Sequence, residues 1–149
     1  MKILVTGVGG QLGHDVMNEL IGRGHTGVGS DIAPEYSGVA DGSAVTTAEY
    51  VPMDITDAAQ VSEVITKVSP DVVIHCAAWT AVDAAEDDDK KAKVKAINAD
   101  GTQNIANVCK QLRCRATHVA KALHRQACAL ELQADAVGCL HTHGEDTAP

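Results

Sequence analysis

The chain opens with an apolar run that leads directly into a glycine-rich turn. Residues 3–5 are Ile-Leu-Val, and they precede Thr6-Gly7-Val8-Gly9-Gly10-Gln11-Leu12-Gly13. A buried strand that ends at Gly7 and enters a helix near Gly13 brings backbone N–H groups and a helix N-terminus to one point, which suits a phosphate group. We therefore predict a βαβ unit that binds a dinucleotide.

The residues after this turn fit the rest of such a unit. Apolar side chains recur at helical spacing from Leu12 to Ile21, and the pattern stops at Gly22-Arg23-Gly24. A weak second strand over residues 26–30 ends at Asp31, 24 residues after Gly7. An acidic side chain near this offset accepts hydrogen bonds from the adenosine ribose hydroxyls. Asp31 is therefore a candidate ribose ligand.

The following segments repeat the alternation of strand and helix. Residues 33–49 lack periodicity and predict a surface loop, and residues 50–54 predict a third strand whose Pro52 suits a sheet edge. A helix is expected from Asp57 to about Ser69, then a fully covered strand over residues 72–76. We predict an α/β fold, an incomplete Rossmann-type doubly wound parallel sheet of about four strands in the order 3-2-1-4.

An acidic run, residues 86–89, is followed at once by four lysines and then by an apolar stripe that reaches Leu112. Acids at a helix start and lysines one turn later complement the helix dipole and form i,i+4 pairs. We therefore predict one further helix here and infer no metal site.

Composition limits the partners and the compartment. The net charge of −8 argues against nucleic acid as a partner, because phosphate backbones are bound by Lys and Arg patches. No long apolar run and no leader-like segment is present, so we expect no membrane span and a cytoplasmic location. Five cysteines in no framework spacing predict reduced thiols.

Several of these residues together resemble the N-terminal half of extended short-chain dehydrogenase/reductases. The shared motifs are Thr6-Gly7-x-x-Gly10-x-x-Gly13, Asp31, Asp54-Ile55, Cys76-Ala77-Ala78 and Asn98-x-x-Gly101-Thr102-x-Asn104. Within that family, residues 75–86 are similar to the corresponding segment of dTDP-4-dehydrorhamnose reductases, the NAD(P)H-dependent enzymes that finish dTDP-rhamnose synthesis. The resemblance covers about residues 1–112, and it is specific because several motifs occur in the right order.

The resemblance implies a dinucleotide as partner and a set of contacts for it. The pyrophosphate would lie on Gly7, Gly10, Gln11, Leu12 and Gly13, the adenosine ribose on Asp31, the adenine between Asp54 and Ile55, and the nicotinamide ribose along Cys76, Ala77, Ala78 and Thr80, with Asn98 organising the active site. Three alternatives stay open: the glycines serve only a tight turn, Asp54 is a cap or turn residue, and Asn98 merely bends its helix. The carboxylate of Asp31 would repel a 2′-phosphate, so NAD is favoured and NADP is possible.

Three other side chains near these motifs are assigned no chemistry. His75 and Cys76 end the predicted fourth strand, where a small thiol more often packs than reacts. His14 follows the last glycine of the turn and is expected to be an exposed helical histidine.

The family's catalytic pair, Tyr-x-x-x-Lys, is missing from this sequence. Tyr36 and Tyr50 are its only tyrosines, and the fourth residues after them are Ala40 and Asp54. We assign no catalytic residue and predict weak or no NAD binding and no turnover by this chain alone, so a nucleotide-sugar substrate is implied only by the family. The alternative is a non-catalytic module that senses a dinucleotide or contacts another protein.

Residues 113–149 differ from the rest of the chain. They are neutral, contain three of the five cysteines and four of the seven histidines, and lack aromatic residues. We place a boundary near Leu112 and favour an out-of-frame or substituted tail. Apolar residues at helical spacing between Val119 and Val137 also allow a structural helix, and the two interpretations are compatible. A metal site from its Cys and His residues is disfavoured, because their spacing matches no zinc pattern. With strand four near an edge, we also expect self-association.

Overall fold

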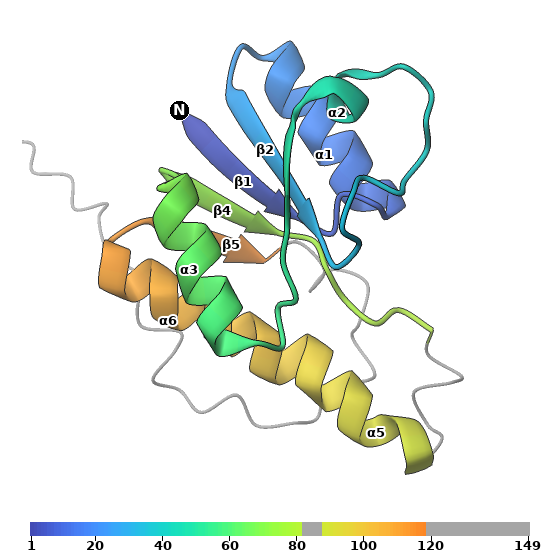
Figure 1. The fold of residues 1–149 in the computed structure, drawn as a ribbon, viewed down its shortest axis with the longest axis vertical. Helices are drawn as coiled ribbons and strands as arrows, with labels where there is room; N and C mark the ends of the chain where they lie inside the picture. Colours follow the sequence, from blue (N-terminus) through green and yellow to red (C-terminus); the bar gives the residue numbers. More distant parts are fainter. Residues whose placement is uncertain (82–87, 119–149) are drawn as a thin grey trace, which may run out of the picture.

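A five-stranded parallel sheet forms the centre of the fold in the computed structural model, which describes residues 1–81 and 88–118 (Figure 1). The order of the strands is β3-β2-β1-β4-β5, and every neighbouring pair is parallel. Their bounds are β1 Lys2–Thr6, β2 Thr26–Asp31, β3 Glu49–Pro52, β4 Val72–His75 and β5 Arg115–His118. Because all the strands run the same way, the loops that follow β1, β2, β3 and β4 gather at one edge of the sheet.

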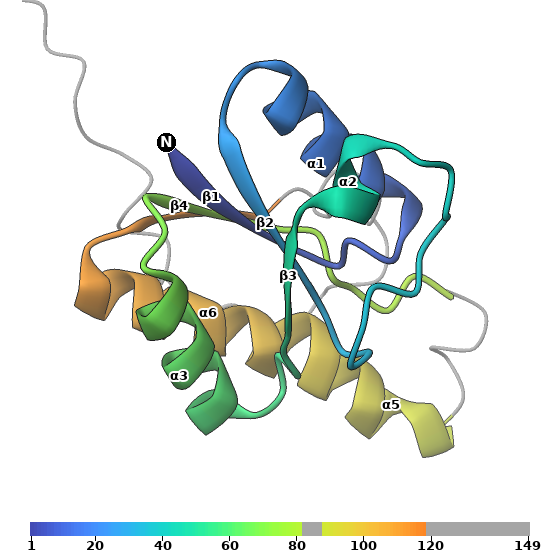
Figure 2. The same ribbon diagram turned by 45° about the horizontal axis from the view of Figure 1, so that its top comes forward.

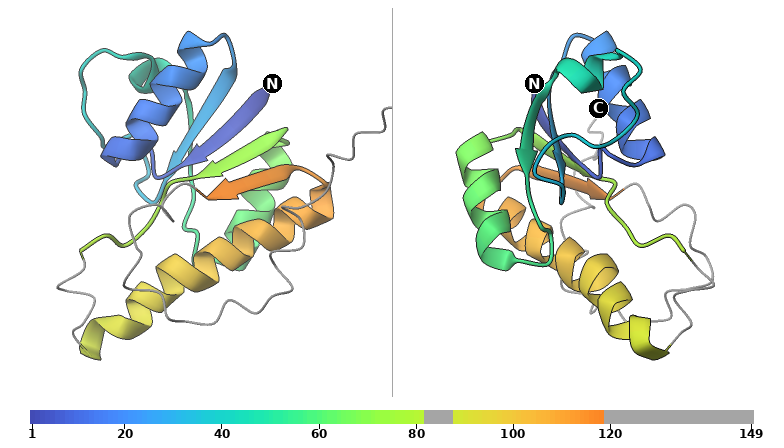
Figure 3. Two further views of the ribbon diagram at one scale, coloured as in Figure 1. Left: turned by 180° about the vertical axis from the view of Figure 1, so that it is seen from behind. Right: turned by 45° about the vertical axis from the view of Figure 1, so that its right-hand side comes forward.

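Helices cover both faces of this sheet. Helices α1 (Gln11–Gly22) and α2 (Ala44–Thr47) lie on one face, and α3 (Ala58–Val68) and α6 (Thr102–Leu112) lie on the other (Figure 2). Helix α5 (Asp88–Lys95) and the π-helical segment η1 (Ala96–Gly101) lead into α6 as one long rod that extends past the sheet (Figure 3). None of the helices in the described residues is both long and apolar enough to cross a membrane.

The sheet separates two apolar clusters. The cluster beneath α3 and α6 is the larger, and its buried members are Leu4, Val28, Met53, Ile55, Val61, Ile65, Val68, Val73, Ile105, Val108 and Cys109. On the other face, the smaller cluster beneath α1 and α2 contains Ile3, Val5, Val8, Met17 and Val45. Alternate residues of β1 enter opposite clusters, as the period of a strand requires. Burial on both faces explains why the β1 sequence is apolar without alternation.

The predicted strand order 3-2-1-4 and the α/β class are confirmed, and Pro52 lies on the edge strand β3 as expected. The strand count was too low, because β5 pairs with β4 in register from Val72↔Arg115 to His75↔His118. Strand four is therefore not at an edge in this structure. Residues 115–117 are exposed, so β5 carries no hydrophobic pattern by which the sequence could have indicated it.

Three local expectations also need correction. The expected loop over residues 33–49 contains the short helix α2, whose Val45 is buried against the smaller cluster. The third strand ends at Pro52 and not at Asp54: the Met53 N–H still bonds to Asp31 O of β2 at 2.8 Å, but the Asp54 N–H bonds to Gln60 Oε1 instead. The expected single helix before Leu112 contains the π-helical turn η1. The proposed helix and most of the Cys and His residues of the tail lie outside the described residues, and the boundary near Leu112 stays a prediction.

Candidate functional site

The turn after β1 is built so closely that glycine is required at its first position. Gly7 has φ +75°, and a Cβ there would lie 2.6 Å from Ala77 N, in the loop after β4. The Gly7 N–H donates to Ser30 O at 2.8 Å, which ties the turn to β2. Gly7 therefore lets three neighbouring strand ends, those of β1, β2 and β4, meet at one point.

Gly13 brings the start of α1 onto the same turn. A Cβ at Gly13 would lie 2.1 Å from Gly7 O, so no side chain fits between the helix and the turn. Helix α1 begins at Gln11, and no side chain caps it at Gly10. The first N–H groups of a helix have no partner within it, and they carry the positive end of the helix dipole. The backbone at Gln11, Leu12 and Gly13 thus presents donors that suit an anionic phosphate.

Asp31 lies beside this turn at the end of β2, as its position in the sequence predicts. Its Oδ2 accepts the Gly9 N–H at 2.9 Å, and its Oδ1 accepts the Ile32 N–H at 2.8 Å. Each carboxylate oxygen has a second acceptor position, so the group can also accept hydrogen bonds from the hydroxyls of a diol. Gly9 was not among the predicted site residues, although it is the second glycine of the turn and directly fixes this carboxylate.

Tyr50 supports the same strand end and was also missed. Its hydroxyl lies 2.5 Å from Ala33 O and 3.2 Å from Asp31 O, so it fixes the chain on both sides of Ile32. Burial, together with the negative charge of Asp31, raises the pKa of the Tyr50 phenol above its usual value. The phenol therefore remains protonated and acts here as a donor to the backbone.

The loop after β3 places Asp54 and Ile55 at the same edge of the sheet. Asp54 Oδ1 accepts from Thr56 N at 2.8 Å and from Thr56 Oγ1 at 2.7 Å, so Asp54 does serve the turn in which it lies. Ile55 is only 8% exposed and packs in the larger cluster. From α6, Asn104 Nδ2 donates to Ile55 O at 2.9 Å. The sequence contained Asn104 within a motif but gave it no role.

The loop after β4 carries the other group of predicted residues. Cys76 and Ala77 continue from the strand, and the Cys76 N–H donates to Thr6 O at 3.2 Å. Ala78 is half-buried and Thr80 is exposed. Asn98, on η1, accepts the Trp79 N–H through Oδ1 at 2.7 Å and donates through Nδ2 to Trp79 O at 3.1 Å. Asn98 therefore fixes this loop from the helix, so bending the helix is not its only effect.

Beneath the site, the buried side chain of His75 links three elements through polar contacts. His75 is 2% exposed, and its Nδ1 lies 2.7 Å from Thr6 Oγ1 while its Nε2 lies 3.2 Å from Thr102 Oγ1. This histidine joins β1, β4 and α6, which fits the structural role expected for it. Burial raises the pKa of the neighbouring Cys76 thiol to about 11, so this group is not a ready nucleophile at neutral pH.

His14 was expected to be an exposed helical residue, and this was wrong. Its side chain is 15% exposed, because Nε2 lies 3.2 Å from Asp41 Oδ2 and 3.2 Å from Ser43 Oγ. The nearby Asn18 Oδ1 also accepts the Val45 N–H at 2.8 Å. The histidine therefore helps to hold the segment that contains α2 against α1, an arrangement that helical periodicity alone does not reveal.

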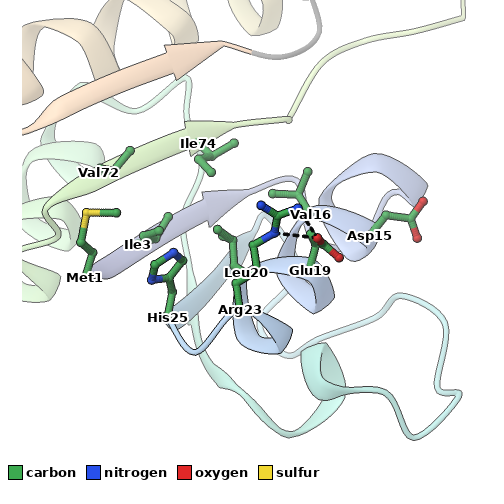
Figure 4. Close-up of a pocket in the computed structure, with 10 residues that line it drawn as sticks. All are labelled: Met1, Ile3, Asp15, Val16, Glu19, Leu20, Arg23, His25, Val72 and Ile74. Atoms are coloured by element: carbon green, nitrogen blue, oxygen red, sulfur yellow. Dashed lines mark hydrogen bonds and ion pairs between the residues drawn. The ribbon is translucent and has the colours of Figure 1, made fainter.

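A shallow pocket lies elsewhere, between α1 and the adjoining residues of β1 and β4. It is lined by Met1, Ile3, Asp15, Val16, Glu19, Leu20, Arg23, His25, Val72 and Ile74 (Figure 4). None of the predicted site residues lines it. Arg23 pairs there with Glu19 at 2.6 Å, on the last turn of α1 (Figure 4). The glycine turn and Asp31, and not this pocket, form the candidate site. Among the described residues, no group of three or more Cys, His, Asp or Glu side chains could hold a metal ion.

Comparison with known proteins identifies the family. A family model described as RmlD substrate binding domain matches residues 1–143. The chain belongs to the RmlD substrate binding domain family. A dTDP-4-dehydrorhamnose reductase of Streptomyces griseus is 36% identical over 107 residues, which are 72% of this chain and 29% of that protein. The chain thus spans about a third or less of the curated relatives it matches. The predicted resemblance to these reductases is confirmed.

Among the solved structures similar to this RmlD-family chain, one is a complex with NAD+ and another is a complex with NADP. The enzyme WbmH of Bordetella bronchiseptica, in complex with NAD+, has a TM-score of 0.60 at 27% identity and covers 75% of this chain and 36% of its own. A dTDP-4-dehydrorhamnose reductase of Bacillus anthracis, in complex with NADP, has a TM-score of 0.56 at 27% identity over 77% and 34% of the two chains. These neighbours support a nicotinamide dinucleotide and do not discriminate between NAD and NADP.

Proposed function

We propose that this chain is the dinucleotide-binding part of an NAD(P)H-dependent reductase of the dTDP-4-dehydrorhamnose reductase type. The observation that carries the proposal is the Asp31 carboxylate, fixed by the Gly9 N–H at 2.9 Å beside the uncapped start of α1. A diol acceptor next to an anion-binding helix start fits a ribose and its phosphate.

The proposed contacts are those that the family resemblance implies. Pyrophosphate lies on the turn at Gly7, Gly10, Gln11, Leu12 and Gly13; the adenosine ribose is held by Asp31; the adenine lies by Asp54 and Ile55; and the nicotinamide ribose follows Cys76, Ala77, Ala78 and Thr80, in a loop held by Asn98. The strand ends at which these residues lie all meet at the carboxyl edge of the sheet, which supports the assignment.

NAD is the proposed cofactor rather than NADP. A 2′-phosphate on the adenosine ribose would approach the negative charge of Asp31. Arg23, a cation that could offset this repulsion, is instead paired with Glu19 at 2.6 Å and lies at the other end of α1. Its place supports the preference for NAD.

The bound cofactor would supply hydride for the reduction of a ketone. The residues of this chain bind and orient the dinucleotide. The 149-residue sequence lacks the Tyr-x-x-x-Lys pair, whose tyrosine would donate the proton. We therefore propose that this polypeptide alone does not turn over, and that a nucleotide-sugar substrate belongs to the wider family activity. A cytoplasmic location stays a prediction from the sequence.

Calorimetric titration of the purified chain tests the proposal. We expect NAD to bind weakly and NADP to bind more weakly still. Asp31→Ala should reduce NAD affinity by about tenfold or more, since a hydrogen-bonded charged group is removed. Asp71→Ala is the matched control, because Asp71 Oδ2 also accepts a backbone N–H, from Lys2 at 2.7 Å, at the far end of the sheet. A folded chain that binds neither dinucleotide contradicts the proposal.

The second candidate is a non-catalytic module that senses a dinucleotide, which the missing Tyr-x-x-x-Lys pair favours. Such a module would bind the dinucleotide as a reductase does but would not reduce a substrate. NADH oxidation measured with the dTDP-keto-sugar separates the possibilities: tight NAD binding without turnover fits both a sensor and an incomplete reductase, whereas turnover by the chain alone contradicts our proposal of inactivity. Adding a separate polypeptide that carries the Tyr-x-x-x-Lys region would restore turnover only for an incomplete reductase.

A further inference from the structure

The loop after β3, residues 53–57, is the immediate neighbour of Asp31. The Met53 N–H donates to Asp31 O at 2.8 Å, and Asp31 is paired with Pro52 in the sheet. Within the loop, Asp57 N donates to Asp54 O at 3.1 Å, and from α3 Gln60 Oε1 accepts the Asp54 N–H. A ribose held by Asp31 would therefore carry its base toward this loop.

Helix α6 holds the loop from the opposite side through one polar side chain. Asn104 Nδ2 donates to Ile55 O at 2.9 Å and makes a longer contact with Thr56 O at 3.4 Å. These bonds join residues 48 and 49 positions apart in the sequence. They fix the orientation of two successive peptide groups, because each carbonyl oxygen is directed toward the same amide.

An apolar contact next to Asn104 completes the arrangement. A Cβ at Gly101 would lie only 2.8 Å from Cγ1 of Ile55, so Gly101 leaves the space that this side chain fills. Ile55 is buried, with its side chain packed against Gly101 at the end of η1. The loop is therefore held to the helix by both its backbone and its side chain.

We propose that Asn104 is a positioning residue for the base of the bound nucleotide, an inference that rests on the proposed function. Asn104 bonds to the loop and not to the ligand, and it acts by fixing the backbone against which the base lies. Fixed peptide groups discriminate between bases, because a displaced loop no longer presents its donors and acceptors at the right distance. Asn104 should therefore affect base selectivity more than binding of the ribose and phosphates.

Titration of the full chain with ADP and with UDP tests this inference, since the two ligands share the ribose and diphosphate and differ in the base. We expect the wild type to prefer ADP. Asn104→Leu and the isosteric Asn104→Asp should lower ADP affinity about tenfold, because the hydrogen bond to Ile55 O is lost, and should leave UDP affinity unchanged. Asn104→Asp keeps the side-chain shape and serves where Asn104→Leu does not fold.

Gln103→Ala is the control, because the Gln103 amide bonds on the exposed side of α6, to Asn107 Oδ1 at 2.8 Å. It should change neither affinity. Equal losses for ADP and UDP would show a purely structural role and overturn the inference, as would unchanged ADP binding or a wild type without base preference. A wild type that binds NAD but shows any of these results leaves the proposed function intact, whereas a folded wild type that binds neither NAD nor ADP refutes both.

Discussion

Asn98 and Trp79 exchange two hydrogen bonds: the Trp79 N–H donates to Asn98 Oδ1 at 2.7 Å, and Asn98 Nδ2 donates to Trp79 O at 3.1 Å. The same rod of helix also bonds the loop after β3 through Asn104. The rod formed by η1 and α6 thus holds both the loop after β4 and the loop after β3. These two loops are proposed to contact opposite ends of a dinucleotide. The π-helical turn η1 carries Asn98, and α6, which follows it directly, carries Asn104.

Asn98→Leu should release the loop that carries Trp79. Two hydrogen bonds are lost, and the free energy of unfolding should fall by about 1–3 kcal/mol. Trp79 is the single tryptophan of the chain, so its fluorescence reports this loop directly. We expect its emission to shift to longer wavelength in the native state. Asn107→Leu, at an exposed position of α6, is the control, and an unchanged Trp79 spectrum in Asn98→Leu would contradict the prediction.

Gly13→Ala should damage the turn itself. The added Cβ would lie 2.1 Å from Gly7 O, so either the helix or the turn must move, at a cost of about 1–3 kcal/mol. Gly22→Ala is the matched control on the same helix, since nothing lies within 4 Å of a Cβ there, and it should stabilise the protein by about 0.5–1 kcal/mol. Denaturant unfolding measures both. Equal stabilities of the two variants would disprove the close contact.

The sequence predicted the parts of the fold that burial determines. Strand β1 and the stripe of α3 consist of apolar residues at the spacing of their elements, so their positions follow from the pattern. The sheet order follows from the connection rules of a parallel, Rossmann-type fold. Asp31 was found because its place at the end of β2 is tied to the turn by the geometry of the βαβ unit. Its neighbour Gly9 was not found, because the bond to a carboxylate depends on how the turn closes in space.

The features that were missed depend on contacts between distant segments. Asn104 is one polar residue on an amphipathic helix, and only the fold brings it to Ile55. His14 looks exposed by helical position, but Asp41 and Ser43 fold back over it. Strand β5 has an exposed, partly charged sequence, and its pairing comes from the free edge of β4 rather than from apolar residues. Local patterns carry none of this information.

Stability should fall at high pH through Cys76. Its folded-state pKa of about 11 is above the usual 9.0 because burial disfavours the thiolate, so the unfolded chain gives up this proton first. The stabilising effect is complete below about pH 9 and is lost as the pH rises toward about 11. The test is the urea midpoint of wild type and of Cys76→Ala, measured across this pH range. The midpoint should fall less with rising pH in Cys76→Ala than in wild type, so the difference between the two proteins should shrink. Parallel declines would contradict the prediction.

Self-association, expected from the sequence, should now involve β5 rather than β4. The Arg115 N–H donates to Asp71 O at 3.1 Å, so residues 115 and 117 bond toward β4 and the backbone of Ala116 faces the other way. In the described part of the chain β5 is an edge strand, whose outward N–H and C=O groups can pair with a second copy. Ala116→Pro removes the outward donor without breaking a bond to β4.

Sedimentation over a range of concentrations tests this last prediction. The wild type should shift toward larger species as concentration rises, and Ala116→Pro should weaken this association about tenfold or more. Ala116→Val keeps the outward N–H and should associate like the wild type, which separates the loss of the donor from a change in side-chain size. Because Ala116 is exposed, neither variant should alter the unfolding midpoint greatly. Association that persists unchanged in Ala116→Pro would contradict a contact through the edge of β5.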